Sequence, residues 1–311
     1  MNLSLFDWHC DTAGEMLRQK QALESNTLAV SLKNASVFER YVQVMAFWTP
    51  YNLSDEAGWE YYQAMYRNLK ADPAIKSQKA CLCTSIPCQV SALPHLLLGV
   101  EDARILNNDI ERLERLYADG IRILTLLWKG ETCIGGSHDT NKGLTEFGKA
   151  VTRRAFAIGM LPDISHASVE SARDVFEIAQ EYHAPVIASH SNAYAVCPVS
   201  RNLRNDQVHA IVKSGGIIGL NLYQGFLKKE PPASAEALLP HIEHCLSLGA
   251  SDALCLGGDM DGCDLPSDIP TLAQLPLLAE LMLRHNYSEQ LVRSIFYENA
   301  FRFAQRYLSK S

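Results

Sequence analysis

The sequence lacks the features that mark membrane-spanning, secreted and nucleic-acid-binding proteins. No apolar stretch approaches the ~20 residues needed to cross a bilayer, and no run of lysine and arginine offsets the net charge of −7 over 311 residues. The N-terminus has no basic segment, and Asp7, His9 and Asp11 interrupt any apolar one. We therefore expect no signal peptide, a cytoplasmic location, and neither membrane nor nucleic acid among the partners.

Two nucleotide-binding signatures are also missing. No Gly-x-Gly-x-x-Gly follows the first expected strand, and no Walker A sequence occurs. The nine cysteines accompany no secretion signal, which favours reduced thiols over a disulfide framework. The one close group, Cys81, Cys83 and Cys88, lacks a second cysteine or histidine pair at zinc-finger spacing. We interpret Cys81 and Cys83 as small apolar residues of a short strand.

What the sequence does have is an alternation of strand-like and helix-like segments from end to end. Hydrophobic residues make up 47% of the chain, which is ample for a large core. We expect strands near residues 3–6, 41–48, 96–100, 121–128, 160–165, 185–189, 216–223 and 253–258, with a further one at 79–84 in an insertion. We expect helices near residues 14–24, 55–70, 110–117, 145–158, 168–182, 206–213, 234–248, 272–284 and 288–307.

This alternation predicts an α/β protein, a TIM-like (β/α)8 barrel formed by residues 1–311 as a single domain. The alternative is an open doubly wound sheet, which the missing nucleotide-binding motifs disfavour. In a barrel the carboxyl ends of all strands converge on one face, and that face carries the chemistry. Polar residues at predicted strand ends are therefore candidate site residues.

The first of these ends carries His9 and Asp11, two residues apart. On a strand such residues point to the same face, so an imidazole nitrogen and a carboxylate oxygen would project together. This pair suits Zn²⁺ or a similar divalent ion. The structural alternative is that Asp11 only caps the helix that follows.

Other predicted strand ends carry the same kinds of residue. The strand-end residues are His9, Asp11, Glu101, Trp128, His166, His190, Tyr223 and Asp259. Independent structural histidines would not all fall at the same ends, so we interpret this set as a site. The remaining histidines lie on predicted helices, in loops or at strand starts, and we interpret them as structural or solvated: His95, His138, His183, His209, His241, His244 and His285.

The number of candidate ligands favours two metal ions. A single catalytic zinc takes about three protein ligands and a water, whereas a pair of metals about 3.5–4 Å apart would use five ligands. Glu101 is the natural bridge between two ions, because a carboxylate has two oxygens to share.

Longer motifs resemble the membrane dipeptidase (renal dipeptidase) family of binuclear zinc peptidases. They stand in the family's order over nearly the whole chain: Asp7-x-His9-x-Asp11, Gly99-Val100-Glu101, Gly120-Ile121-Arg122-x-Leu124-Thr125-Leu126, Gly143-Leu144-Thr145-x-Phe147-Gly148, Asp163-Ile164-Ser165-His166-Ala167-Ser168, Pro185-Val186-Ile187-Ala188-Ser189-His190-Ser191-x-Ala193-Tyr194, Arg201-Asn202-Leu203, and Gly257-Gly258-Asp259-x-Asp261-Gly262.

The resemblance implies a TIM-like barrel, often a homodimer, that hydrolyses dipeptides through a hydroxide bridging two Zn²⁺ ions. It implies that His9 and Asp11 hold one zinc and that His166 and His190 hold the other. Glu101 would bridge the two ions. Tolerance of a D-residue at the C-terminal position of the substrate is a further expectation from the family.

The resemblance also implies roles around the metals. Arg201 would bind the terminal carboxylate of a small peptide substrate, a role that suits a guanidinium. Asp259 would orient the attacking water and pass its proton to the leaving amine. We expect Trp128 and Tyr223 to contact the substrate. Well-studied members carry a histidine at the position of Trp128, and tryptophan donates only through its indole N–H and cannot become cationic.

Two other functions stay open at this point. One is a metal-dependent amidohydrolase on the same barrel, acting on N-acyl amino acids or cyclic amides; that group typically opens with His-x-His rather than His9-x-Asp11. The other is a non-catalytic relative that keeps the fold, for which Trp128 is the only indication.

Overall fold

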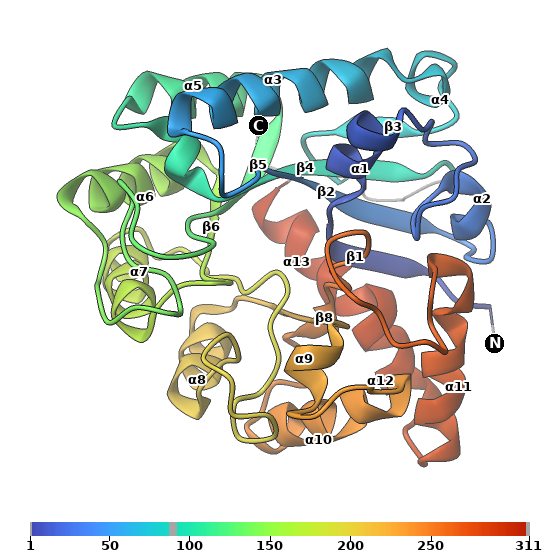
Figure 1. Cartoon of the computed structure of the whole chain (residues 1–311). Coiled ribbons are helices and arrows are strands. Elements are labelled where there is room, and N and C mark those ends of the chain that lie inside the picture. The colour runs from blue at the N-terminus through green and yellow to red at the C-terminus, as the bar shows by residue number, and fades with distance from the viewer. Residues whose placement is uncertain (1, 87–91, 309–311) are drawn as a thin grey trace.

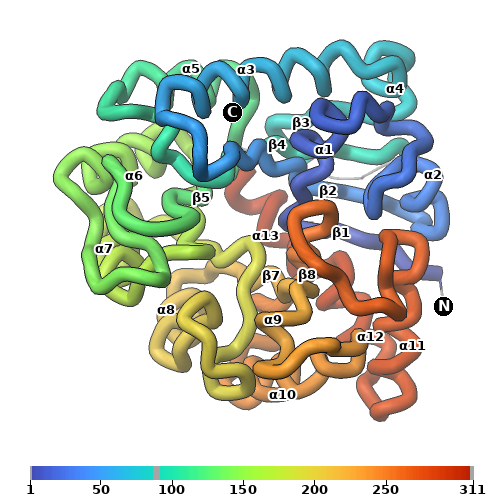
Figure 2. The backbone as a smooth tube through the Cα atoms, viewed as in Figure 1, coloured from blue at the N-terminus to red at the C-terminus, as the bar shows by residue number. Residues whose placement is uncertain are grey.

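Seven parallel strands and one short extended segment form the wall of a barrel in the computed structural model, which describes residues 2–86 and 92–308 (Figure 1). In sheet order the strands are β6 (Leu161–Asp163), β5 (Ile121–Thr125), β4 (His95–Glu101), β2 (Tyr41–Trp48), β1 (Leu5–Cys10), β8 (Leu254–Leu256) and β7 (Ile218–Leu220). Figure 2 shows how the first and last strands of the chain, β1 and β8, come side by side.

Residues 187–188 close the ring between β6 and β7. Ile187 bridges to Asp163 and Ala188 to Ile218, both in parallel. The expected strand at 185–189 is therefore reduced to two bridges. The reason is that the Ser189 N–H donates to Asp163 Oδ1 at 2.9 Å instead of extending the ladder. With this segment included, the TIM-like barrel predicted from the sequence is confirmed.

A short outer strand, β3 (Cys81–Cys83), pairs with the first half of β4, whereas β5 pairs with the second half. The Sγ atoms of Cys81 and Cys83 lie 3.4 Å apart on β3. Both are half-buried free thiols. The other described cysteines are also free thiols, and each is half-buried or buried. Cys88 lies outside the described residues.

Helices surround the barrel in chain order (Figure 1). The longer ones are α1 (Thr12–Gln19), α3 (Asp55–Ala71), α5 (Ile110–Ala118), α6 (Glu146–Ile158), α7 (Val169–Glu181), α8 (Asn205–Ser214), α10 (Leu239–Ser247), α11 (Pro276–Arg284) and α13 (Asn299–Tyr307). The shorter ones are α2 (Leu32–Ala35), α4 (Pro73–Lys76), η1 (Ala103–Leu106), α9 (Gln224–Leu227), η2 (Ala235–Leu238), η3 (Leu272–Gln274) and α12 (Glu289–Arg293).

Local capping explains several of the boundaries. Thr145 precedes α6 and accepts a hydrogen bond from the Gly148 N–H at 3.0 Å, and Ser168 does the same for α7. The expected single helix over 288–307 is wrong in its middle, because η4 (Ser294–Glu298) is a π-helical turn between α12 and α13. Within residues 2–86 and 92–308, no helix is both long and apolar enough to cross a bilayer.

The interior of the barrel is filled by alternate residues of the strands. Phe6 and Trp8 of β1 stack at 5.1 Å between ring centroids, and Phe303 of α13 meets Trp8 edge-on at 5.5 Å. Helix α13 packs on β1 and β8. It therefore closes the end of the barrel that lies opposite the strand carboxyl ends.

We predict that Phe303→Ala destabilises the protein by about 3–5 kcal/mol, because it leaves a cavity against Trp8 at the closed end. The matched control is Phe301→Ala on the same helix, where the side chain is only partly buried. Urea unfolding followed by circular dichroism measures both. Equal losses for the two variants would contradict the burial of Phe303 against Trp8 at the closed end.

Candidate metal centre

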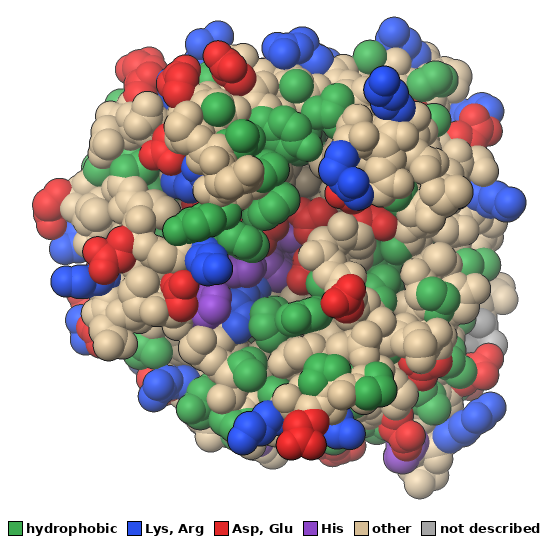
Figure 3. All heavy atoms as spheres, in the orientation of Figure 1, with side chains coloured by type: hydrophobic (Ala, Val, Ile, Leu, Met, Phe, Trp, Pro, Cys, Tyr) green, Lys and Arg blue, Asp and Glu red, His purple; other side chains and the backbone are tan. Residues whose placement is uncertain are grey.

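The carboxyl ends of the strands open into a cavity of about 690 Å³. In the space-filling view this hollow shows histidine and carboxylate groups at its centre and hydrophobic side chains along its rim (Figure 3). The predicted residues Trp128 and Tyr223 line it, together with Glu101, His166 and Asp259. The volume falls within the range of about 300–1,000 Å³ that is usual for small-molecule sites.

Asp11 lines this cavity, and an irregularity in β1 brings His9 beside it. Phe6 and Trp8 point into the barrel, so strict alternation would turn His9 outward. The register between β1 and β2 shifts between Asp7 and Cys10, which is the effect of a bulge. As a result His9 faces inward, and its Nε2 lies 3.5 Å from Asp11 Oδ2.

The capping alternative for Asp11 is not what the structure has. Asp11 occupies the N-cap position of α1, but its side chain makes no capping hydrogen bond. Its carboxylate instead lies with the strand-end cluster, and its Oδ1 is buried without a hydrogen-bond partner among the described residues.

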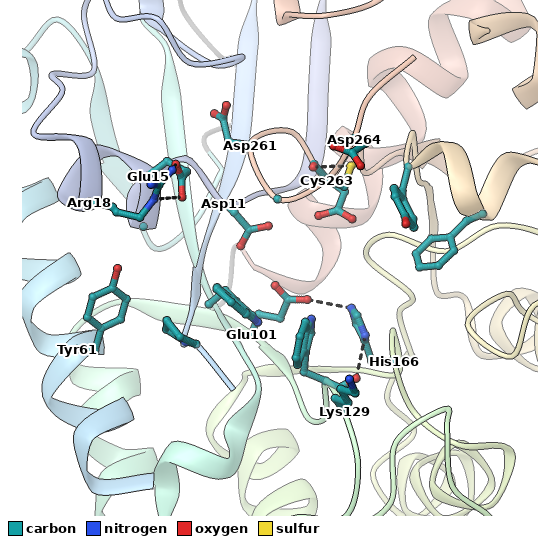
Figure 4. Close-up of a pocket in the computed structure, with 18 of the residues that line it drawn as sticks. Asp11, Glu15, Arg18, Tyr61, Glu101, Lys129, His166, Asp261, Cys263 and Asp264 are labelled. Atoms are coloured by element: carbon teal, nitrogen blue, oxygen red, sulfur yellow. Dashed lines mark hydrogen bonds and ion pairs between the residues drawn. The ribbon is translucent and has the colours of Figure 1, made fainter. Parts of the chain in front are cut away.

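Glu101, at the end of β4, stands between the two halves of the expected ligand set. Its Oε2 lies 3.3 Å from His9 Nε2. Its Oε1 lies 3.0 Å from His166 Nε2 and 3.4 Å from His190 Nε2. Each carboxylate oxygen therefore faces a different group of histidines. Figure 4 shows the interaction between Glu101 and His166.

Interactions of their Nδ1 atoms orient His166 and His190. His166 Nδ1 lies 3.1 Å from the backbone oxygen of Trp128, and this interaction turns its Nε2 toward Glu101. Ser189 Oγ donates to Asp163 Oδ2 at 2.5 Å and lies 2.7 Å from His190 Nδ1. Because the Ser189 hydroxyl hydrogen points to Asp163, the serine oxygen accepts a hydrogen bond from the Nδ1–H of His190. The Nε2 atom of His190 is then unprotonated and keeps a free lone pair.

Asp259 approaches the same cluster from the end of β8. Its Oδ1 lies 3.8 Å from His9 Nε2, and its Oδ2 accepts a hydrogen bond from Asn221 Nδ2 at 3.0 Å. Asp259 has a φ of 57°, a strained value for a residue with a side chain. The turn that follows needs Gly262, where an added Cβ would lie 2.0 Å from Asp11 Oδ2.

Burial and charge set the protonation of these groups. Burial, assisted by the Arg201 charge, lowers the pKa of His166 to about 3, and burial lowers the pKa of His190 too. Both imidazoles are therefore neutral, as metal ligation requires. Burial raises the pKa of Asp11, and the nearby Glu101 charge raises it further.

The residues present fit divalent metal ions. Ligand atoms come together in two groups, and within each group they all lie within 4.8 Å of one another. One group is His9, Glu101 and His190, and the other is His9, Asp11 and Asp259. The Nε2 atoms of His166 and His190 face each other at 3.0 Å. Buried carboxylates and imidazole lone pairs that converge in this way are costly without a cation between them.

Arg201 lies apart from the metal cavity. It is buried and lines a neighbouring cavity, where its Nη2 donates to the backbone oxygen of His190 at 2.8 Å and its Nη1 to Ser191 Oγ at 2.7 Å. The guanidinium is thus tied to the metal centre through His190, and on its other side it faces the neighbouring cavity.

Several residues that line the cavity or hold its ligands were not predicted, among them Trp48, Phe226, His138 and Asn221. His138, interpreted as structural or solvated, lines both cavities and lies 5.9 Å from the His166 ring. No local pattern singles it out, because a long loop carries it there. Asn221, which holds Asp259, directly follows β7 and could have been found by the same strand-end rule.

We predict that Gly262→Ala lowers metal affinity by about 10- to 100-fold, since the methyl group would displace the Asp11 carboxylate. The control is Gly14→Ala on α1, where the added Cβ would lie 3.5 Å from Met65 Sδ, an ordinary contact. Calorimetric titration of metal-free protein with Zn²⁺ measures both. Unchanged affinity in Gly262→Ala would show that Asp11 is not a ligand.

Comparison with known proteins agrees with this geometry. A family model described as membrane dipeptidase (Peptidase family M19) matches residues 2–308. Dipeptidase 3 of Macaca fascicularis is 32% identical over 215 residues, and the match covers 66% of this chain but 43% of that protein. The chain thus spans less than half the length of that relative.

Two solved structures have the same fold. The structure of a dipeptidase designated AC, a metallopeptidase of family M19, is 26% identical and superposes with a TM-score of 0.91 over 99% of both chains. A metallopeptidase from Rhodobacter sphaeroides, solved with a phosphinate mimic of the dipeptide L-Ala-D-Ala, is 24% identical with a TM-score of 0.90, and the match covers 99% of this chain and 100% of that one.

The family match over nearly the whole chain, on a barrel with converging metal-binding side chains, shows that this protein belongs to the membrane dipeptidase family (peptidase family M19) and is a peptide-bond hydrolase.

Proposed function

We propose that this protein is a zinc-dependent dipeptidase with a two-metal site. The observation that carries the proposal is the position of Glu101, which faces His9 with one carboxylate oxygen and His166 and His190 with the other. A residue placed in this way suits a bridging ligand. His9 and Asp11 would then hold one ion, and His166 and His190 the other.

The chemistry needs a polarised carbonyl and an activated water. When bound, divalent ions supply Lewis acidity that polarises the peptide carbonyl and makes water a nucleophile near neutral pH. Asp259 accepts the proton of the attacking water and returns it to the leaving amine. Asn221 holds one oxygen of Asp259, which leaves Oδ1 directed toward His9 and the cluster.

Other residues would position the substrate. Arg201 keeps its Nε without a hydrogen-bond partner among the described residues, which supports binding of a terminal carboxylate there. Trp128 lies in an aromatic wall with Trp48 and Tyr51, at ring distances of 5.2 and 6.1 Å. On the other side Tyr223 packs edge-on against Phe226 at 4.7 Å. These rings would bound the space for the two side chains of a dipeptide.

Tolerance of a D-residue at the C-terminal position is part of the proposal, since a relative of the same fold binds a mimic of L-Ala-D-Ala. The homodimer and the cytoplasmic location expected from the sequence stay predictions.

We predict that the purified protein hydrolyses L-Ala-L-Ala and L-Ala-D-Ala when loaded with Zn²⁺, and that a chelator abolishes this activity. Release of alanine measures the rate for each peptide, and metal content is measured on the same samples. Hydrolysis of N-acetyl-alanine but of neither dipeptide would favour the amidohydrolase instead. Zinc-loaded protein that cleaves none of these compounds would contradict the proposed function.

We predict that Asp259→Asn keeps its zinc and loses about 10²- to 10⁴-fold in kcat, because the amide cannot take up a proton. Asp252→Asn provides the matched control, since that carboxylate is exposed and pairs with Arg302 at 3.5 Å, far from the cavity. Metal analysis accompanies the kinetics. Full activity in zinc-loaded Asp259→Asn would rule out the proton-transfer role.

A further inference from the structure

A second cavity, of about 580 Å³, adjoins the metal cavity. It lies between the loop that follows β5 and the loops that follow β6 and residues 187–188. His138 lines both cavities and thus lies where they adjoin. Its Nδ1 lies 2.9 Å from Ser200 Oγ, and its backbone N–H donates to the His166 backbone oxygen at 2.7 Å.

The side chains that line the two cavities carry opposite charge. The cations that line the second cavity are Lys142, Arg173, Arg201 and Arg204. Among the described residues that line it, Glu170 is the one carboxylate. The metal cavity, in contrast, is lined by the carboxylates Asp11, Glu15, Glu101, Asp259, Asp261 and Asp264, against the cations Arg18 and Lys129. The second cavity therefore attracts anions by its own charge.

The surroundings of Arg201 indicate that an anion binds in this cavity. Its side chain is 4% exposed, and the partners of its Nη atoms are neutral oxygens of Ser191 and His190. Its Nε is buried with no hydrogen-bond partner, and it forms no ion pair with a carboxylate of the described residues. No carboxylate of the described residues lies within ion-pair distance of this buried guanidinium, and the charges of Asp259, Asp163 and Glu101 act on it only from further away, so an anion in the cavity would complete its interactions.

Further positive charges lie beyond Arg201. Arg173 is already paired with Glu170. Arg204 lies over the ring of Tyr194 at 5.4 Å, and neither it nor Lys142 forms an ion pair within the described part of the chain. Lys142 is held in place because its backbone oxygen accepts hydrogen bonds from Ser168 and Ser171. Two charges thus remain available in addition to Arg201.

We propose that this cavity binds a second carboxylate of the substrate, so that the protein prefers dipeptides with an acidic C-terminal residue. The inference rests on the proposed function. Arg201 binds the terminal carboxylate, and Lys142 and Arg204 bind the carboxylate of a glutamate or aspartate side chain. The ammonium end of the peptide then lies on the side of the carboxylates around the metal cavity.

The test compares glutamate with its neutral isostere. We expect kcat/KM for alanyl-glutamate to exceed that for alanyl-glutamine by roughly tenfold at low ionic strength, measured for both the L and D forms of the second residue. Added NaCl should reduce this ratio, because Lys142 and Arg204 are exposed and their charges are screened by salt.

A pair of variants then assigns the preference to the cavity. In Lys142→Gln/Arg204→Gln the ratio should fall toward one. The control, Lys213→Gln/Arg284→Gln, makes the same change in net charge at exposed positions of α8 and α11 outside both cavities, and its ratio should match that of the unmodified protein. Circular dichroism checks that each variant is folded.

The outcomes separate the two proposals. The inference is wrong if the zinc-loaded protein cleaves both peptides at equal rates, or if Lys142→Gln/Arg204→Gln keeps the full ratio. Either result leaves the proposed dipeptidase function in place. If the zinc-loaded protein cleaves no dipeptide at all, the proposed function is wrong, and calorimetry with the same peptides tests the cavity alone. Tighter binding of alanyl-glutamate than of alanyl-glutamine would then support the inference, and equal binding would overturn it.

Discussion

One buried carboxylate, that of Glu101, is the constraint on which the site depends. Its two oxygens face His9 on one side and His166 and His190 on the other. These residues come from the ends of β1, β4, β6 and the segment 187–188, so only a closed ring of parallel strands brings them together. The same closure buries Glu101 to 3% exposure. A carboxylate buried to this degree needs positive charge nearby, which metal ions would supply.

Much of this arrangement follows from the sequence, because strand ends in a barrel converge. The rule that site residues lie at strand ends identifies Glu101, because a long apolar run precedes it in β4. It fails where tertiary contacts override local pattern. The bulge that turns His9 inward depends on the pairing of β1 with β2, and nothing in the sequence of β1 marks it. His138 reaches the site because Ser137 bridges to Ala167 across a long loop, a contact that no periodicity encodes.

Backbone strain collects at the same positions. His166 and Asp259 have φ values of 69° and 57°, a region that favours glycine. Each is held by hydrogen bonds from neighbouring segments: the His138 N–H binds the backbone oxygen of His166, and the Asp259 N–H binds that of His9. Where ligand atoms must converge, the backbone thus adopts φ values that these residue types disfavour. The surrounding hydrogen bonds hold the backbone in that conformation. This explains why site residues break rules that the helices and strands around them obey.

Charge acts at two ranges on this protein. The net charge of −7 repels an anionic substrate at long range. The cations around Arg201 attract it only within the second cavity, over distances comparable with the Debye length of about 8–10 Å at moderate ionic strength. Selectivity for a carboxylate therefore arises after the substrate has entered, from contacts that neutral isosteres cannot make. A negatively charged protein can in this way favour a negatively charged substrate, because recognition depends on the local arrangement of charge and not on its sum.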